Sequence, residues 1–303
     1  MKRESILFHG IIPPMITLFD QQGEIDWKAN QTLVDWLIGQ GIHGILFNGS
    51  SGEFPSLTIE ERKLFAKEMT AYVNGRIPVI IGTGSTSIKD TIDLSQHAES
   101  IGASGVLIVN PYYWQFTDDN LYRYYTTIAD HTSISILLYN IPLLTGKSLS
   151  SELVTRLAIS RDNIVGIKDT IDNIGHIREL ILSIHQVRPD FAVFAAFDEH
   201  LLPALQIGAV GAINGTANFA PHISVQLYES FKRGAFAEAI QWHQKLIRLM
   251  PIYQYSDPFF IGVKEAVHQL VLNYRTGARL PSGEIDQPLI DKINHFLEQN
   301  GLK

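Results

Sequence analysis

Eight short runs of β-branched and other apolar residues recur along this chain, and this repeat limits how the chain can fold more than any other feature. Glycine, proline, asparagine and other turn residues bound the runs, as is typical of strands. Segments with apolar residues at helical spacing separate the runs. The predicted strands are 10–16, 43–48, 77–82, 105–110, 133–140, 163–169, 191–197 and 210–213.

Capping residues mark the starts of several helices between these strands. Thr58 with Glu61 forms a capping-box pattern, and Thr117 and Ser150 precede further helical segments. Strands that are apolar throughout and alternate with amphipathic helices imply a parallel sheet covered on both faces, and eight such units close into a barrel. We therefore predict an α/β fold, a (β/α)₈ TIM barrel. An open doubly wound sheet is the alternative, but residues 10–23 lack its glycine-rich phosphate turn.

Helical patterns continue after the eighth predicted strand, at 224–250, 262–273 and 288–300. We expect residues 221–303 to form a C-terminal helical extension packed on a barrel of residues 1–220, as one structural unit. The 303 residues fit such an arrangement, since no repeat or long linker divides the chain.

Composition narrows the class of partner. The net charge is -7 and no basic cluster occurs, which argues against nucleic acid and favours a small-molecule substrate. The chain has no cysteine, so disulfides, thiolate metal sites and a catalytic thiol are excluded. Polar residues and a proline pair interrupt the apolar stretch that a signal peptide would need within residues 1–19, so we expect a cytoplasmic protein with no membrane partner.

The sixth predicted strand ends in IVGIKDT, which places Lys168 at the carboxyl end of an apolar run. Catalytic groups of (β/α)₈ barrels lie at this end of the strands. Burial disfavours an ammonium ion there, and a neutral amine is a nucleophile that forms a Schiff base with a ketone. Lys264 lies in a similar sequence, GVKEA, but within a helical pattern, so we expect a surface or helix-packing lysine.

Other polar groups are predicted at the same edge of the sheet. Ser50 and Ser51 stand between two glycines and could offer hydroxyl and N–H donors to a carboxylate, or form an ordinary turn. Tyr139 ends the fifth predicted strand, where a phenol could exchange protons with a bound intermediate, although strand tyrosines are more often packed rings. Tyr112 and Tyr113 could equally be core or interface aromatics.

Asp198, Glu199 and His200 follow the seventh predicted strand and could be mistaken for a metal site. Adjacent residues at a helix start point in different directions, and no second cluster completes a ligand set, so we predict no metal. The two carboxylates could complement the helix dipole, or hold the hydroxyl groups of a substrate.

Taken together, five features resemble the dihydrodipicolinate synthase/N-acetylneuraminate lyase family, whose members are pyruvate-dependent class I aldolases on a (β/α)₈ barrel. They are GSSGE at 49–53, NPYY at 110–113, YNIP at 139–142, GIKDT at 166–170 and the helical extension. The resemblance runs from about Gly10 to the C-terminal helices. The order and spacing of these features are those of the family.

The resemblance implies catalytic roles for four residues. Lys168 would carry the Schiff base, and Tyr139 would transfer protons. Ser50 would join a hydroxyl relay with Tyr139 and with Tyr113, which in this family comes from a neighbouring subunit of a tetramer, a dimer of dimers. No cofactor is implied, because the lysine itself provides the electron sink.

The resemblance also implies substrate contacts. Ser51 would bind the pyruvyl carboxylate, and the backbone carbonyl of Ile213 would face the pyruvyl group. Thr170, Asp198 and Glu199 would bind sugar hydroxyls.

Three positions separate the branches of the family. Leu144 stands where the synthases carry an arginine that grips a second carboxylate, and an apolar side chain cannot make that contact. Ala196 and Gly215 stand where sialic-acid lyases place a glycine and a serine. The resemblance is therefore greatest to bacterial 2-keto-3-deoxygluconate/pentonate aldolases, which reversibly cleave a 2-keto-3-deoxy sugar acid to pyruvate and a hydroxyaldehyde. The alternatives are a sugar-acid dehydratase, an N-acetylneuraminate lyase, a dihydrodipicolinate synthase and a non-catalytic sugar-acid-binding protein.

Overall fold

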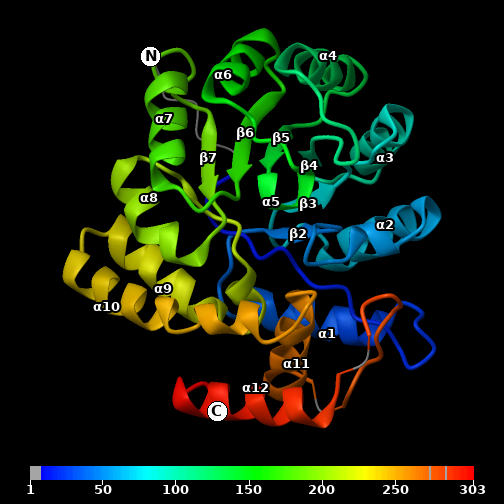
Figure 1. The fold of residues 1–303 in the computed structure, drawn as a ribbon, viewed down its shortest axis with the longest axis vertical. Coiled ribbons are helices and arrows are strands. Elements are labelled where there is room, and N and C mark those ends of the chain that lie inside the picture. Colours follow the sequence, from blue (N-terminus) through cyan, green and yellow to red (C-terminus); the bar gives the residue numbers. More distant parts are fainter. Residues whose placement is uncertain (1–7, 273, 284) are drawn as a thin grey trace.

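The computed structural model describes residues 8–272, 274–283 and 285–303, and these residues include a single eight-stranded sheet in which every strand pair is parallel. The start of the chain and Asn273, on which parts of the export-signal and helix predictions rest, lie outside the described residues. In Figure 1 the strands stand at the centre and the helices surround them. The strands are β1 (Gly10–Ile11), β2 (Ile45–Phe47), β3 (Val79–Gly82), β4 (Gly105–Val109), β5 (Ile136–Asn140), β6 (Ile164–Asp169), β7 (Ala192–Ala195) and β8 (Gly211–Ala212).

The sheet closes on itself. Its strand order runs β1-β8-β7-β6-β5-β4-β3-β2, and the two ends meet where Pro14 forms a parallel bridge with Leu46. The Met15 N–H donates to the Leu46 carbonyl at 2.9 Å across this junction. The predicted (β/α)₈ barrel is thereby confirmed.

Helices follow the strands in alternation, and a group of helices ends the chain (Figure 1). The α-helices are α1 (Trp27–Gly39), α2 (Ile59–Val73), α3 (Ile88–Ser100), α4 (Asp118–Ala129), α5 (Pro142–Thr145), α6 (Ser151–Ser160), α7 (Ile174–Ile184), α8 (Leu201–Ile207), α9 (Pro221–Lys232), α10 (Phe236–Ile247), α11 (Phe260–Leu270) and α12 (Gln287–Gln299). The 3₁₀ helices are η1 (Phe54–Ser56), η2 (Asp198–His200), η3 (Gly215–Asn218) and η4 (Met250–Gln254).

The capping residues start their helices as predicted. The Thr58 hydroxyl accepts a hydrogen bond from the Glu61 N–H, and the Glu61 carboxylate accepts one from the Thr58 N–H, which completes the capping box of α2. Thr117 and Ser150 cap α4 and α6 in the same way.

Two predicted boundaries were wrong for identifiable reasons. β1 ends at Ile11 rather than at residue 16, because Pro13 and Pro14 have no N–H to donate to a ladder. The long helix predicted at 224–250 is two helices, α9 and α10, which are separated near Gly234. That glycine has a φ of 78°, a conformation that ends a helix readily.

The pleat of each strand sends alternate residues to two separate apolar layers. Leu137 and Phe194 belong to the cluster inside the barrel, whereas Leu138 and Ile167 belong to the layer between strands and helices. The helix α9 packs against β1 and α10, and α11 packs against α12. Among the described residues, no helix is long and apolar enough to cross a membrane.

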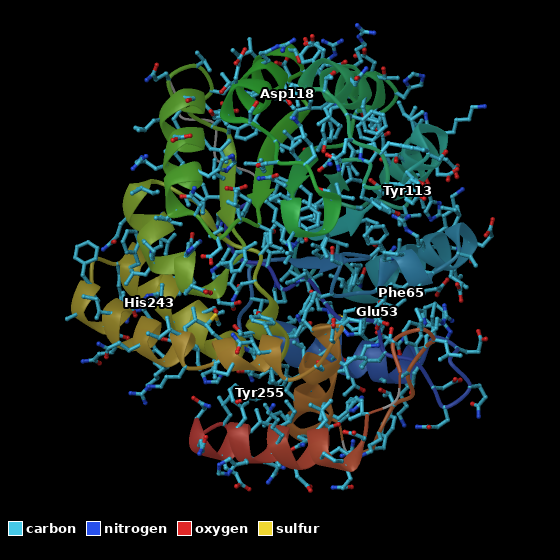
Figure 2. The ribbon with its side chains drawn as sticks, in the orientation of Figure 1. Glu53, Phe65, Tyr113, Asp118, His243 and Tyr255 are labelled. Carbon is cyan, nitrogen blue, oxygen red and sulfur yellow. The ribbon has the colours of Figure 1, made fainter. Side chains whose placement is uncertain are left out.

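Lys264 is neither a surface lysine nor a simple packing residue. It lies in α11 and is 1% exposed, and its amine pairs with the carboxylate of Glu53, which is also 1% exposed and ends the Gly-Ser-Ser-Gly-Glu segment. Burial lowers the pKa of Lys264, and the facing carboxylate opposes that shift. Figure 2 shows Glu53 between α2 and the C-terminal helices, so this ion pair joins the extension to the mouth of the barrel.

We predict that Lys264→Met lowers the free energy of unfolding by about 3–5 kcal/mol, because it leaves the buried Glu53 carboxylate without its cation. Urea unfolding measures the loss. The double variant Glu53→Gln, Lys264→Met should recover part of it, since neither charge remains. Lys67→Met, at an exposed position of α2, is the control and should stay within about 0.5 kcal/mol of the unsubstituted protein. Equal stability of the Lys264 and Lys67 variants would contradict this account.

Candidate active site

An amine and a phenol meet inside the barrel where β5 pairs with β6. Tyr139 and Lys168 are direct partners in that pairing, so both side chains point to the same face of the sheet. The Lys168 Nζ donates to the Tyr139 hydroxyl at 3.3 Å and lies 4.4 Å from the centre of its ring. Lys168 is 4% exposed and Tyr139 is 3% exposed. The pair is therefore held close together and largely away from solvent.

The glycine-serine segment after β2 supplies a third polar group. The Ser50 Oγ lies 3.3 Å from the Tyr139 hydroxyl, within hydrogen-bonding distance. Tight turns shape this segment, because the Gly52 N–H donates to the Gly49 carbonyl and the Glu53 N–H donates to the Ser50 carbonyl. The Thr17 hydroxyl donates to the Gly52 carbonyl and ties the segment to a distant part of the chain. Serine, phenol and amine thus form one continuous chain of polar groups.

A pocket of about 270 Å³ surrounds these groups. Leu144, Ala196 and Gly215, the positions that separate the branches of the resembled family, also line it. All but two of the predicted site residues contribute to its wall: Ser50, Ser51, Tyr139, Lys168, Thr170, Asp198 and Ile213. The structure therefore brings together residues that lie in or directly after five different strands, β2, β5, β6, β7 and β8.

Glu199 and Tyr113 are not among the residues that line this pocket. Glu199 lies in η2, and partial burial raises the pKa of its carboxyl group. Tyr113 is 77% exposed and contacts Trp114 edge to face. Figure 2 shows Tyr113 at the periphery of the barrel near α3, away from the strands at the centre.

Asp198 faces the pocket, but donors from the protein already occupy both of its oxygens. Oδ1 accepts from the Asn214 amide at 2.6 Å, from the Thr216 hydroxyl and from the Thr216 N–H at 3.3 Å. Oδ2 accepts from the Tyr253 hydroxyl at 2.6 Å. Burial raises the pKa of Asp198, and the hydrogen bonds oppose that shift. These hydrogen bonds fix the position of the Asp198 carboxylate in the wall of the pocket.

Thr170 is in the opposite situation. Its hydroxyl is buried and lines the pocket, and it has no hydrogen-bond partner among the described residues. A buried hydroxyl without a partner costs free energy, so a bound ligand that hydrogen-bonds to it would recover that cost.

A larger hollow of about 740 Å³ lies beside the pocket and shares part of its wall, including Ser50, Leu144 and Tyr253. Lys168 lines only the inner pocket, so the buried amine belongs to the inner part of a two-part cavity. Among the described residues, Lys168 is also the one lysine or arginine that lines either part. No group of three or more His, Asp or Glu side chains in the described parts of the chain could hold a metal ion.

Behind the strand, Asp169 points away from the pocket and is fully buried. Its carboxylate accepts from the Asn140 amide at 2.6 Å and pairs with the His176 Nδ1 at 2.8 Å. The other ring nitrogen of His176 lies 3.1 Å from the Leu149 carbonyl. The hydrogen bond to Asp169 raises the pKa of His176, and burial opposes that shift. These contacts hold the end of β6, and with it the backbone of Lys168.

Sequence reasoning missed Tyr253, His176 and the Glu53–Lys264 pair. Tyr253 lies in η4, which is too short to show a helical pattern of apolar residues. His176 lies in the first turn of α7. The one signal in the sequence is a lysine within the apolar pattern of α11, for which the pattern predicts a surface or helix-packing lysine.

Comparison with known proteins agrees with this geometry. The model of the Dihydrodipicolinate synthetase family matches residues 7–300. YagE of Escherichia coli K12, named as a 2-dehydro-3-deoxy-D-gluconate aldolase, is 42% identical over 98% of each chain. YjhH of the same organism, named as a 2-dehydro-3-deoxy-D-pentonate aldolase, is 41% identical over 97% of this chain and 98% of its own. The chain belongs to the dihydrodipicolinate synthetase family, as its motifs indicated.

Solved structures give the same result. The crystal structure of YagE in complex with pyruvate superposes with a TM-score of 0.95 at 41% identity, covering 98% of this chain and all of that one. The dihydrodipicolinate synthase of Thermotoga maritima superposes with a TM-score of 0.92 at 31% identity, again over 98% and 100% of the two chains.

We predict that His176 stabilises the fold at acid and neutral pH and loses this effect at alkaline pH. Its raised pKa means that the folded state binds the proton more tightly, so the contribution is complete below the unfolded pKa of about 6.5 and disappears as pH rises through the folded pKa. The charged and polar groups that face the ring are Asp169, Glu179 and the Leu149 carbonyl.

The measurement is the difference in unfolding free energy between the unsubstituted protein and His176→Gln across pH 5 to 9. The difference should shrink as pH rises. His295→Gln, at an exposed position of α12, is the control and should show no such trend. A difference for His176 that is constant or grows with pH would refute the prediction.

Proposed function

We propose that this chain is a class I aldolase that reversibly cleaves a 2-keto-3-deoxy sugar acid to pyruvate and a hydroxyaldehyde, through a Schiff base on Lys168. The observation that carries the proposal is the buried Lys168 amine 3.3 Å from the Tyr139 hydroxyl, with both residues in the wall of a pocket. The names of YagE and YjhH and the pyruvate complex of YagE support the same substrate class.

The chemistry begins at the substrate ketone. The neutral Lys168 amine attacks C2. The C2 oxygen leaves as water with one proton from the amine and one from the Tyr139 phenol, which leaves an iminium and a Tyr139 phenolate. The iminium accepts the electrons of the C3–C4 bond as that bond breaks, while the phenolate takes the proton of the C4 hydroxyl and C4 becomes the carbonyl of the aldehyde. The remaining enamine takes a proton at C3 from the Tyr139 phenol, and hydrolysis of the resulting iminium releases pyruvate, the free amine and the proton that restores the phenol.

The neighbouring hydroxyls serve these steps. Ser50 passes protons to and from Tyr139, because their oxygens are 3.3 Å apart. Ser51 binds the carboxylate of the pyruvyl group beside the turn that it shares with Ser50, and the backbone of Ile213 borders the same group. The protein's own lysine acts as the electron sink, so the proposal requires no cofactor.

The wall of the pocket favours a sugar acid over the second substrate of a synthase. Leu144 lines both parts of the cavity at the position where a synthase would need a cation for a second carboxylate. In place of a cation, the pocket offers hydroxyl and carboxyl groups, those of Thr170 and Asp198. Such groups suit the hydroxyls of a sugar chain. Of the three proposed sugar contacts, Glu199 has the least structural support, because it does not line the pocket.

We predict that borohydride with pyruvate reduces an adduct onto the peptide that contains Lys168. Lys168→Ala should abolish both the adduct and pyruvate release from 2-keto-3-deoxy acids. Tyr139→Phe should lower cleavage by roughly 10²–10⁴-fold, the usual share of acid–base catalysis, and adduct formation by less. Mass spectrometry locates the adduct, and a lactate dehydrogenase assay measures pyruvate release.

Lys245→Ala, on the surface helix α10, is the control and should change neither quantity. An adduct on any other peptide would refute the assignment of Lys168. A product that retains the whole carbon skeleton would instead identify a dehydratase, and adduct formation without turnover of any sugar acid would identify a binding protein.

We also propose that the active form is a homotetramer in which Tyr113 completes the relay of a neighbouring subunit. Tyr113 is 77% exposed and Trp114 is 69% exposed, and neighbouring large aromatic side chains on a surface are typical of protein contacts. Tyr112 beside them lines the outer hollow together with Ser50, so this loop lies close to the cavity. A cytoplasmic location and a role in carbohydrate metabolism belong to the same proposal.

Hybrid oligomers test this role of Tyr113. Alone, Tyr113→Phe should be poorly active and Lys168→Ala inactive, whereas co-expressed hybrids with separate affinity tags should regain activity. In a hybrid, one site combines an intact Lys168 with the intact Tyr113 of the other subunit. Hybrids of Lys168→Ala with Tyr139→Phe are the control and should regain none, because both residues act within one chain. Full activity of Tyr113→Phe alone would exclude the proposed relay.

A further inference from the structure

We propose that Tyr253 determines specificity at the distal end of the substrate: its phenol oxygen accepts a hydrogen bond from a hydroxyl on the aldehyde half, beyond C4. The inference rests on the proposed aldolase function and adds to it a residue of the C-terminal extension. It is argued from the position of Tyr253, from the commitment of its proton and from the space that Gly215 leaves.

Tyr253 lies where the two parts of the cavity join. It lines both the inner pocket and the outer hollow, whereas Lys168 lines only the inner pocket. Tyr253 comes from η4 of the C-terminal extension, and its hydroxyl is hydrogen-bonded to Asp198, whereas Ser50, which also lines both parts, is bonded to Tyr139. A substrate bound to Lys168 through C2 extends toward this junction with the carbons that become the aldehyde.

The hydrogen bonds of Tyr253 fix what it can offer a ligand. A phenol has one proton to donate and lone pairs that accept. The proton of Tyr253 is donated to Asp198 Oδ2 at 2.6 Å, so the group that faces the cavity is an acceptor. Asp198 is buried, and Asn214, Thr216 and Tyr253 already donate hydrogen bonds to it. The backbone of Thr216 also hydrogen-bonds to the Tyr253 hydroxyl, which uses one of the two lone pairs of the phenol oxygen. The second lone pair is left to accept from a substrate hydroxyl.

Gly215 makes this position of the ring possible. A Cβ atom at residue 215 would lie 2.6 Å from the Tyr253 hydroxyl oxygen and 3.1 Å from its Cε1. A side chain there would displace the phenol from both the pocket and Asp198. Gly215 and Tyr253 thus form a matched pair, and both line the pocket of about 270 Å³.

The ligand chemistry follows from these groups. The pocket has a hydroxyl without a partner at Thr170 and a hydrogen-bond acceptor at Tyr253. The preferred substrate class is therefore a short 2-keto-3-deoxy acid with a hydroxyl on C5. A substrate with hydrogen at C5 leaves the acceptor unused, so it should be cleaved less efficiently.

The experiment is a two-by-two comparison of enzyme and substrate. The enzymes are the unsubstituted protein and Tyr253→Phe, and the substrates are C4-racemic 2-keto-3-deoxypentonate and 4-hydroxy-2-oxopentanoate, which lacks the C5 hydroxyl. Tyr253→Phe should lower kcat/KM for the pentonate by roughly 2- to 13-fold, as expected for one neutral hydrogen bond, mainly through KM. It should change kcat/KM for the deoxy analogue by less than about twofold.

Two further variants strengthen this comparison. Tyr255→Phe is the matched control, because Tyr255 packs on Phe296 near α12, and it should affect neither substrate (Figure 2). Gly215→Ala should reproduce the selective loss by displacing the phenol, and should add little to it in the Tyr253→Phe background.

The outcomes separate this inference from the proposed function. Equal losses on both substrates, or no loss on either, would overturn the role of Tyr253 if the unsubstituted protein still cleaves both substrates and forms the pyruvate adduct. An unsubstituted protein that forms no adduct and cleaves neither substrate would instead overturn the aldolase proposal. A selective loss on the pentonate, with the adduct intact in Tyr253→Phe, supports both.

Discussion

The site depends on the register between β5 and β6. Because Tyr139 is paired directly with Lys168, the pleat sends both side chains into the barrel, and the amine reaches the phenol at 3.3 Å. A slip of one residue in either strand would turn its side chain toward the helices. Ser50 joins the pair from β2, on the other side of the barrel, so closure of the sheet is as necessary as the register.

The C-terminal helices are part of the site as well as of the fold. Lys264 of α11 neutralises Glu53, which ends the segment that carries Ser50 and Ser51. Tyr253 of η4 donates to Asp198, which follows β7. In both cases a residue of the C-terminal helices pairs with a buried carboxylate of the barrel. A buried carboxylate without such a partner costs free energy, so the barrel site and the C-terminal helices depend on each other.

Much of the fold could be predicted because its signals are local. Apolar runs and turn residues identified all eight strands, and the capping pattern of Thr58 with Glu61 located the start of α2. The wrong boundaries also have local causes, such as the proline pair that follows β1. Lys168 was identifiable because a lysine at the end of an apolar strand is chemically unusual, and the family motifs indicated its neighbours. Tyr253 and His176 gave no comparable signal, since a tyrosine or a histidine in a short helical segment has many ordinary roles.

The sequence by itself determined the barrel, its order of strands and helices, and the edge at which Lys168, Tyr139 and Ser50 would meet, because strand period, helix capping and turn chemistry act over a few residues. Only the tertiary structure decided which groups hold Asp198. Its neighbours in the sequence are Phe197 and Glu199, yet its carboxylate accepts hydrogen bonds from Asn214, from Thr216 of η3 and from Tyr253 of η4. These donors lie 16, 18 and 55 residues away along the chain. Hydrogen bonds over such separations depend on how the whole chain packs, and no local pattern encodes them.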